Sequence, residues 1–307
     1  MKRGNTDLSF LLGVDKPVGI SSHDLVNKIR GITQEKRVGH AGTLDPLASG
    51  VMLLAVGPAT RLLHYLSADN KAYRARISFG TQTTTDDSEG EVLYNKAVPG
   101  EVLQAEYAKE ILSQFLGMQK QVPPNFSAIH IDGKRAYDLA RGGNAPEIKA
   151  RTVEIYSAEL LQICREDSIF WDVYFDVSKG TYIRSLARDI GKTVGSCAHL
   201  KSLRRCVSGK VSLEQCLRAE TIKAAQIQLQ NYALNPVELL EAQEYHLNES
   251  ELEYIKNGSL PHIKKLDKVD WCFTYQSKLF AYQKNVNVDK AQTVYFPKGI
   301  EGVAACC

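Results

Sequence analysis

Long apolar runs, which would anchor a protein in a membrane, are missing from this 307-residue chain. The apolar run Val51–Val56 is far shorter than the ~20 apolar residues that span a bilayer. A secretion signal is missing too, because the basic start Met1–Arg3 is followed by polar Asn5, Thr6 and Asp7 where an apolar stretch would begin. We therefore expect a cytoplasmic protein with no membrane partner.

Cysteine is present, but its spacing argues against two common kinds of site. The seven cysteines form no Cys-x-x-Cys pair and are odd in number, which disfavours both a zinc site and a disulfide framework. The pattern is typical of a protein in a reducing compartment. Because the spacing disfavours a zinc site, we also expect no metal. Cys306 and Cys307, at the end of the sequence, receive no functional assignment. Internal repeats and low-complexity tracts are likewise missing.

An excess of charge of one sign is also missing. The formal net charge is +3 and the pI is near 8.3, which permits a nucleic-acid partner without requiring one. Hydrophobic residues make up 44% of the chain. At this length, that content is enough to bury the core of one large domain and a small one.

The chain mixes strand patterns with helix patterns. Alternating apolar residues predict half-exposed strands over Tyr73–Phe79 and Ile169–Val177. The apolar run Phe10–Val14 predicts a buried strand, and Ser21-x-x-Asp24 after it has the spacing of a capping box that opens a helix. Together these patterns predict an α+β fold with a mixed, mainly antiparallel sheet.

The composition changes toward the C-terminus. Short alternating runs at Trp271–Tyr275 and Leu279–Tyr282 predict a small β-rich module, and the polar stretch Glu244–Glu253 marks the junction before it. We therefore expect one domain over residues 1–243 and a second over residues 244–307.

The segment His40–Val51 carries the most distinctive pattern. Asp45 has little helical or strand pattern around it and stands between Gly42 on one side and Pro46 and Gly50 on the other. Glycine allows close backbone approach to a ligand and proline stiffens the chain, so a rigid loop could present this carboxylate for reaction. On spacing alone, an aspartate before proline is more often a turn cap.

Six segments within residues 8–210 resemble the motifs of one enzyme family, in the family's order. They are Asp15–Ser22, Gly39–Val51, Lys71–Tyr73, Val122–Ala128, Gly180–Arg184 and Leu203–Arg205. The segment around Asp45 resembles the catalytic motif of the bacterial tRNA pseudouridine-55 synthases, the TruB-type enzymes. One such match would be weak evidence, whereas six in register are strong.

The resemblance implies a mixed-sheet pseudouridine-synthase domain followed by a small PUA-like RNA-binding domain. It also implies conversion of uridine 55 in the tRNA T loop to pseudouridine, without a cofactor. This reaction cleaves the N-glycosidic bond, rotates the base and rejoins it through C5, which needs a nucleophile and no redox step. Asp45 matches that nucleophile, and Arg184 matches the cation that keeps it ionised. Whether Asp45 attacks the ribose or the base stays open.

Four further residues match family positions that bind the target nucleotide. Tyr73 matches a tyrosine that stacks on the base, and Tyr182 and Leu203 match residues that line the uracil pocket. His40 matches a histidine that inserts into the T loop beside the flipped nucleotide. Ordinary alternatives exist, since Tyr73 and Leu203 would by default be core residues and His40 a loop residue or a general base. Without the family, Arg184 would be an exposed residue of an amphipathic helix.

Basic and aromatic residues are interleaved in Gln121–Gly143, as suits phosphate contacts and base stacking. They are Lys134, Arg135, Tyr137 and Arg141. A solvated surface loop is the alternative. Two residues depart from the family pattern: Phe126 stands where a tyrosine is usual and His130 where a lysine is expected. These departures concern the details of RNA binding and leave the chemistry untouched.

Two other classes of function compete with this one. An RNA chaperone with a vestigial catalytic loop would have no need of an intact Asp45, Tyr73 and Arg184. A glycosidase would normally pair Asp45 with a second carboxylate, and no other acid lies in a comparably distinctive motif. The leading hypothesis is therefore a monomeric enzyme that binds the T-arm stem-loop of tRNA and uses no metal or cofactor.

Overall fold

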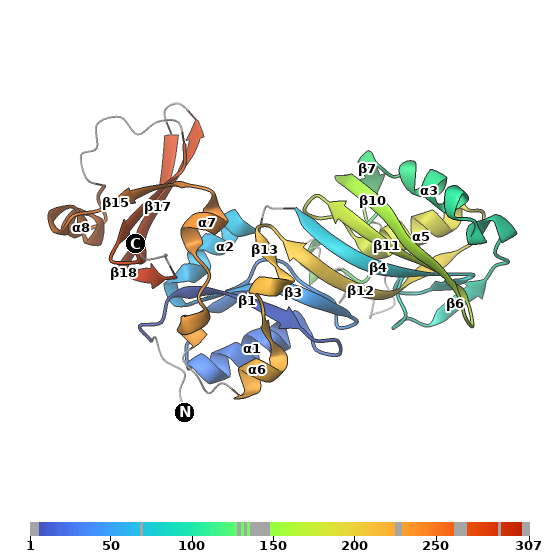
Figure 1. The fold of residues 1–307 in the computed structure, drawn as a ribbon, viewed down its shortest axis with the longest axis horizontal. Helices are drawn as coiled ribbons and strands as arrows, with labels where there is room; N and C mark the ends of the chain where they lie inside the picture. The colour runs from blue at the N-terminus through green and yellow to red at the C-terminus, as the bar shows by residue number, and fades with distance from the viewer. Residues whose placement is uncertain are drawn as a thin grey trace. The chain divides into compact units, whose positions relative to one another are not determined.

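The computed structural model describes residues 6–67, 70–127, 130–131, 134–135, 148–224, 229–260, 269–287 and 290–302. The chain forms two compact units (Figure 1). The first combines residues 1–68 with residues 207–307, and the second is the continuous segment 69–206. An N-terminal and a C-terminal segment of the chain therefore belong to one unit.

The sheet of the first unit has both parallel and antiparallel neighbours. β1, Phe10–Lys16, pairs antiparallel with β3, Ala48–Val56, and parallel with the short β14, Leu217–Arg218. β2, Val38–His40, also pairs antiparallel with β3. The predicted buried strand over Phe10–Val14 is confirmed as the first part of β1.

α1, Ser22–Thr33, begins at the predicted capping box. The Asp24 N–H donates to Ser21 Oγ at 3.1 Å, and the Ser21 N–H donates to Asp24 Oδ2 at 2.9 Å. The apolar face of α1 packs on the strands. Together they form one apolar cluster, whose buried residues are Phe10, Leu12, Val14, Leu25, Val26, Ile29, Val38, Met52, Leu54, Val56, Ile222 and Leu229.

A separate sheet forms the C-terminal part of the first unit, in the order β15-β16-β17-β18. β15, Gln243–His246, pairs parallel with β16, Trp271–Tyr275. β17, Lys278–Asn287, and β18, Lys290–Glu301, continue the sheet with antiparallel pairs. α8, Glu249–Lys256, packs against it. The expected β-rich C-terminal module is confirmed.

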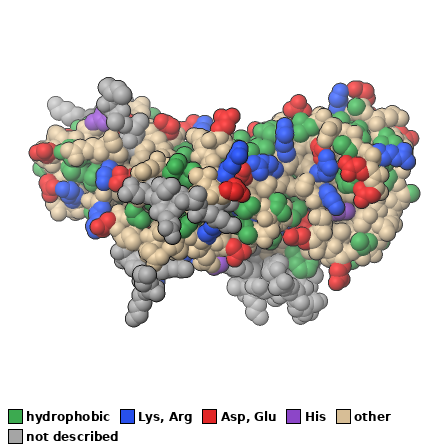
Figure 2. Space-filling view, turned by 60° about the horizontal axis from the view of Figure 1, so that its bottom comes forward, with side chains coloured by type: hydrophobic (Ala, Val, Ile, Leu, Met, Phe, Trp, Pro, Cys, Tyr) green, Lys and Arg blue, Asp and Glu red, His purple; other side chains and the backbone are tan. Residues whose placement is uncertain are grey.

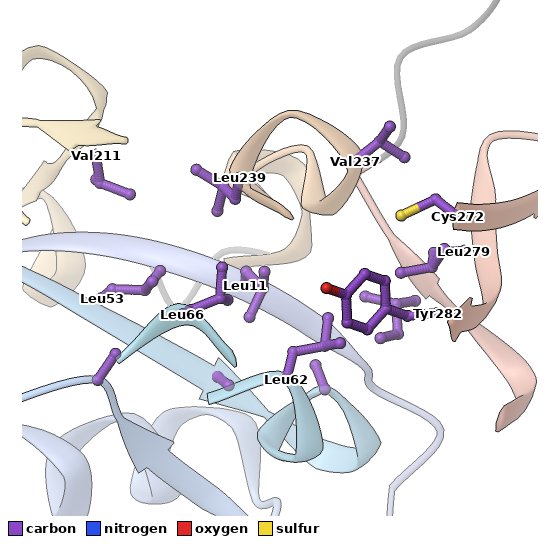
Figure 3. Packing of buried hydrophobic residues seen from close by; sticks show 14 of the residues in the cluster. Leu11, Leu53, Leu62, Leu66, Val211, Val237, Leu239, Cys272, Leu279 and Tyr282 are labelled. Atoms are coloured by element: carbon purple, nitrogen blue, oxygen red, sulfur yellow. The ribbon is translucent and has the colours of Figure 1, made fainter. Parts of the chain in front are cut away.

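The C-terminal sheet shares a buried core with the N-terminal strands (Figure 3). Leu11 of β1 and Leu53 of β3 belong to the same apolar cluster as Leu279 and Tyr282 of β17. The Tyr282 ring meets the ring of Tyr65 edge to face, with centroids 4.9 Å apart. Folding of the first unit therefore joins the two ends of the chain through apolar burial.

Short elements connect these strands. They are η1 (Gly57–Leu62), α2 (Leu63–Leu66), β13 (Val211–Ser212), η3 (Leu213–Gln215), α6 (Ala219–Ala224), η4 (Leu229–Tyr232) and α7 (Pro236–Leu240). The backbone also joins the two ends, since the Glu301 N–H donates to the Ser9 carbonyl at 2.8 Å, a normal hydrogen bond.

The sheet of the second unit runs in the order β12-β4-β11-β10-β7. The strands are β12 (Ala198–Ser208), β4 (Lys71–Phe79), β11 (Ile169–Val177), β10 (Arg151–Arg165) and β7 (Gly117–Gln121). The β4–β11, β11–β10 and β10–β7 pairs are antiparallel. Both strands predicted from alternation are confirmed, as β4 and β11, and so is a mixed, mainly antiparallel α+β fold.

Helices and small hairpins complete the second unit. They are β5 (Thr81–Thr83), β6 (Val92–Asn95), η2 (Gly100–Leu103), α3 (Ala105–Ser113), β8 (His130–Ile131), β9 (Lys134–Arg135) and α5 (Ile183–Thr193). Trp171 of β11 is fully buried. Its ring packs edge to face on Phe79, and its indole N–H donates to the Val102 carbonyl at 2.8 Å.

The surface carries charges of both signs. On the face drawn in Figure 2, acidic and basic side chains are interspersed, with apolar side chains between them. Within the described residues, no helix combines the length and the apolar character needed to cross a bilayer.

Candidate active site

Asp45 lies in the loop that joins β2 to β3 and is half-buried. The residue before it, Leu44, is held on both of its backbone polar groups by one side chain. The Leu44 N–H donates to Ser22 Oγ at 2.8 Å, and the Ser22 hydroxyl donates back to the Leu44 carbonyl at 2.9 Å. Because Ser22 is itself buried at the start of α1, the helix holds the backbone that leads into Asp45.

The residue after Asp45 is held from a different direction. The Gly19 N–H donates to the Pro46 carbonyl at 2.9 Å. The turn that contains Gly19 is organised by Lys16, whose buried ammonium donates to the Pro17 carbonyl at 2.9 Å and to the Ile20 carbonyl at 2.7 Å. Lys16 therefore supports the loop through backbone contacts.

Two glycines let the chain turn on each side of the acid. Gly42 has φ = +114° and Gly50 has φ = +109°, values that side chains rarely tolerate. The Ala48 N–H donates to the Asp45 carbonyl at 3.0 Å, which closes a turn after Asp45. The loop thus holds one carboxylate in a defined backbone position, as a reactive group requires. His40, at the end of β2, lies just before this loop and is half-buried.

The second unit holds the other four candidate residues. Tyr73 on β4 is 7% exposed and lies opposite Phe175 of β11, and Leu203 on β12 is 9% exposed. Tyr182 precedes α5 and is half-buried, and Arg184 lies in the first turn of α5. The burial of Tyr73 and Leu203 is compatible with their core alternative as well as with a pocket.

Arg184 is buried, contrary to the alternative of an exposed helix residue, and it has partners within its own unit. Its guanidinium lies 3.4 Å from Asp87 Oδ2, and the side chains of both residues are almost inaccessible. It also donates to the carbonyl of Thr85 at 3.1 Å and to the carbonyl of Phe126 at 3.0 Å. A guanidinium donates in several directions from one plane, which suits this set of acceptors. The pair of Arg184 with Asp45 would join the two units and stays a prediction.

A second arginine of α5 repeats the arrangement one turn later. Arg188 Nη1 donates to Asp86 Oδ2 at 2.9 Å, and the same side chain bonds the carboxylate of Asp189. Burial raises the pKa of Asp86, and the charge of Arg188 opposes that rise. Asp86 also has φ = +60°, an uncommon backbone conformation for a residue with a side chain.

Sequence reasoning missed Asp86 and Asp87. They lie in a polar, threonine-rich segment before Gly90 with no strand or helix periodicity. Their one available signal is the presence of two adjacent acids, which in a loop is ordinarily a solvated surface feature. Their importance depends on burial beside α5, which the sequence pattern does not contain.

The stretch Gln121–Gly143 is described in part. Val122 is exposed, Pro123 and Pro124 are buried, and Phe126 is half-buried. The predicted RNA-contacting side chains and the departure at position 130 lie outside the described side chains, so their role stays a prediction. They are Lys134, Arg135, Tyr137, Arg141 and His130.

Comparison with known proteins gives the family. The model of the "TruB family pseudouridylate synthase (N terminal domain)" matches residues 30–183, and that of the "tRNA pseudouridylate synthase B C-terminal domain" matches residues 184–247. A tRNA pseudouridine synthase B of Trichormus variabilis is 42% identical over 261 residues, which cover 85% of this chain and 83% of the relative. One from Mycobacterium bovis is 44% identical over 203 residues, 66% of this chain and 67% of the relative.

Solved structures agree on the fold. A chain in the crystal structure of a Cbf5-Nop10-Gar1 complex has a TM-score of 0.61 and 25% identity, and the match covers 90% of this chain and 78% of that chain. A chain in an H/ACA RNP bound to a substrate RNA has a TM-score of 0.62 at 21% identity, over 97% of this chain and 86% of that chain. On the family models and the identity to its relatives, the chain belongs to the TruB family of pseudouridylate synthases.

Proposed function

We propose that this chain converts uridine 55 in the T loop of tRNA to pseudouridine, with Asp45 as the nucleophile and the target nucleotide flipped out of its stack. The observation that carries the proposal is the loop of Asp45, whose backbone is held on both sides by Ser22 and Gly19. The resemblance of the motif around Asp45 and the name of the relatives, tRNA pseudouridine synthase B, support the same reaction on tRNA.

The proposed chemistry is an isomerisation, in which uridine and pseudouridine have the same composition and one hydrogen is exchanged with solvent. Asp45 forms an adduct with the target nucleotide, the N-glycosidic bond breaks, the base rotates, and a new bond forms from C5 to the ribose. C5 then loses its proton to solvent, and the ring nitrogen that the ribose has left takes up a proton. Asp45 leaves as the bond from C5 to the ribose forms if it attacked the ribose, and after that bond has formed if it attacked the base. Attack on the ribose and attack on the base are both compatible with this sequence of steps.

The remaining site residues have supporting roles in the proposal. Arg184 keeps Asp45 ionised in a pocket from which water is displaced. Tyr73 stacks on the uracil and takes part in proton transfer at C5, and Tyr182 and Leu203 line the pocket. His40 occupies the space left by the flipped nucleotide, which offsets part of the few kcal/mol that unstacking costs.

We also propose that residues 1–243 form the catalytic domain and that residues 244–307 form a PUA-like RNA-binding domain in a monomeric protein. The separate four-stranded sheet β15–β18 supports this assignment.

A transcript of unmodified tRNA tests the reaction. After incubation with the protein, base-resolution mapping is expected to show one new pseudouridine, at position 55. A transcript with cytidine at position 55 is the control and should remain unmodified. Pseudouridine outside the T loop, or none at all, would overturn the proposed substrate.

Asp45→Asn tests the nucleophile, because the amide keeps the shape of the side chain and removes its nucleophilicity. We expect a single-turnover rate at least ~1,000-fold below that of the unaltered protein, with the tRNA dissociation constant changed less than about twofold. Substantial turnover by this variant would exclude Asp45 as the nucleophile.

A further inference from the structure

Gln121, the last residue of β7, reaches the residue that begins α5. The residue is 2% exposed. Gln121 Oε1 accepts the Tyr182 N–H at 2.8 Å, and Gln121 Nε2 donates to the Tyr182 carbonyl at 3.1 Å. One carboxamide therefore bonds both backbone polar groups of a residue that is 61 positions away in the sequence. Two bonds from one planar group restrict the orientation of residue 182 more than either bond alone.

The two hydrogen bonds from Gln121 hold the N-cap residue of α5, where a helix has backbone groups without partners of its own. The side chain of Tyr182, the N-cap residue, makes no capping hydrogen bond, and the Tyr182 carbonyl already accepts the first helical bond, from the Leu186 N–H at 3.1 Å. Gln121 uses the second lone pair of that carbonyl and the N–H of the same residue. The direction in which the chain enters α5 is thus set from β7.

The ring of Tyr182 is restrained by the neighbour of Gln121 in the sheet. Arg151 of β10 lies directly opposite Gln121 in the antiparallel ladder. Its guanidinium carbon lies 5.9 Å from the centroid of the Tyr182 ring, within the range of a cation–π contact. One residue of this cross-strand pair therefore holds the backbone of Tyr182, and the other lies over its ring.

The segment that follows Gln121 is bonded to α5 as well. Ser185 Oγ and Arg188 Nη2 both donate to the Val122 carbonyl at 2.9 Å, and Arg184 Nη2 donates to the Phe126 carbonyl at 3.0 Å. Gln121 is the first contact in this series. A change in its side chain would act on the N-cap residue Tyr182 and on the first turn of α5, which carries Arg184.

We propose that Gln121 is a positioning residue for pseudouridine formation, which orients Tyr182, and through the first turn of α5 Arg184, without touching the reacting atoms. This inference rests on the proposed place of Tyr182 in the uracil pocket. Displacement of a catalytic group by about 1 Å is enough to cost on the order of 100-fold in rate, so removal of these two backbone bonds has a measurable effect.

Gln121→Met is the principal test, because methionine keeps the length of the side chain and removes both bonds. We expect the single-turnover rate on unmodified tRNA to fall by about tenfold or more, with the tRNA dissociation constant changed less than about threefold. Gln121→Glu keeps the acceptor for the Tyr182 N–H but places a second acceptor oxygen against the Tyr182 carbonyl, so its rate should also fall below that of the unaltered protein. Gln119→Met is the matched control on the same strand, since Gln119 bonds the carbonyls of Gln114 and Leu116.

A double-mutant cycle separates positioning from general stability. If Gln121 acts through the ring of Tyr182 as well as through Arg184, Gln121→Met should slow Tyr182→Ala by a smaller factor than it slows the unaltered protein. Multiplied rate losses in the double variant would overturn the inference, because the two residues would then act independently. Equal rates for Gln121→Met and Gln119→Met would overturn it as well.

Hydrogen exchange gives a readout that does not depend on turnover. The amide proton of Tyr182 should exchange at least about tenfold faster in Gln121→Met than in the unaltered protein, since it no longer has its acceptor. Unchanged exchange at this amide would overturn the inference whatever the substrate is. Failure of the unaltered protein to modify tRNA would instead overturn the proposed function, and the exchange measurement would still decide the contact.

Discussion

Arg184 has a buried guanidinium that bonds several acceptors. Asp87 supplies a carboxylate, and Thr85 and Phe126 supply carbonyl oxygens. Burying a charge is costly unless it is paired and hydrogen-bonded, so this set of acceptors is what allows Arg184 to be 5% exposed. The same residue is the proposed partner of Asp45, and its orientation therefore matters as much as its charge.

Arg184→Lys should lose far more activity than a like-charge exchange suggests. Lysine donates from a single ammonium and cannot reach the Asp87 carboxylate and both carbonyls with the geometry of a guanidinium. We expect the single-turnover rate to fall by about 100-fold, with tRNA affinity nearly unchanged, and Arg184→Ala to be slower still. Near-normal rates in both variants would show that Arg184 has no part in the chemical step.

At the scale of single residues, the sequence predicts some residues of the site and not others. Asp45 could be recognised because glycines and a proline surround it in a motif, and the structure shows those glycines at positive φ. Asp87 and Gln121 could not, since each is important only for a contact with α5, which lies far along the sequence. Such contacts depend on how strands and helices pack, and the local sequence around these two residues gives no sign of them.

Turns between elements depend on glycine in two physically different ways. At Gly57, φ is +64° and a Cβ would overlap the carbonyl oxygen of Leu8. At Gly117, φ is +80° and a Cβ would meet no atom within 4 Å. The first position therefore adds a steric clash with backbone to the conformational strain that both positions share.

Gly57→Ala should consequently destabilise the protein more than Gly117→Ala. Strain alone costs about 1–2 kcal/mol, whereas the clash at Gly57 should raise the loss in the free energy of unfolding to about 3 kcal/mol or more. Urea unfolding of the two variants checks the difference. Equal losses would mean that the turn after β3 moves away from Leu8 at little cost.

Strand β4 is joined to β11 by a cross-strand ion pair as well as by its backbone. Arg76 lies opposite Asp172, and its Nε and Nη2 each lie 2.8 Å from a different carboxylate oxygen. The bonds from Arg76 lower the pKa of Asp172, although burial opposes this effect and Gln162 adds a further bond. The charged carboxylate is therefore favoured in the folded state.

The sign of this shift sets its dependence on pH. Because the folded-state pKa lies below the ordinary value of 3.8, the stabilisation is present above that value and is lost as the pH falls through the folded pKa. Asp172→Asn should reduce the free energy of unfolding by about 1 kcal/mol at pH 7, a value kept small by partial exposure of the pair. The difference from the unaltered protein should shrink between about pH 4 and pH 2, two values at which urea unfolding can be compared. A constant difference would show that the carboxylate is not what stabilises the strand pair.

The sequence predicts the individual helices and strands better than it predicts which of them pack together. The capping box at Ser21, the alternation along β4 and β11, and the β-rich end of the chain are local patterns, and all are confirmed. Local patterns do not show which strands share a core. The packing of β17 on the N-terminal strands therefore had no signal in the sequence, although it decides how the first unit is built.

At the scale of the whole molecule, the C-terminal sheet has a structural role beside its proposed role in RNA binding. Cys272, Leu279, Tyr282, Phe296 and Ile300 are buried in the same cluster as residues of β1, β3 and η1 (Figure 3). Removing residues 244–307 would expose the apolar side chains that these residues cover, and the shortened chain would lose stability through that exposure. A truncation therefore confounds folding with binding, and a test of RNA contacts has to leave the sheet in place.

Charge substitutions in the full chain meet that requirement. Lys256 on α8 is part of the described structure, whereas Lys264, Lys265 and Lys268 lie outside the described residues. If these lysines bind phosphates, replacing all four with glutamine should weaken tRNA binding and flatten its dependence on salt. The expected change is about 0.7–0.9 in log Kd per log salt for each phosphate that is no longer neutralised.

The matched control is Lys109→Gln on α3, where Lys109 bonds Glu106 on the exposed side of the helix. The single-turnover rate at saturating protein should stay unchanged in both variants, because neither set of lysines belongs to the proposed site. A salt slope in the fourfold variant equal to that of the control would show that the C-terminal sheet contributes to the core of the first unit and not to binding of the RNA backbone.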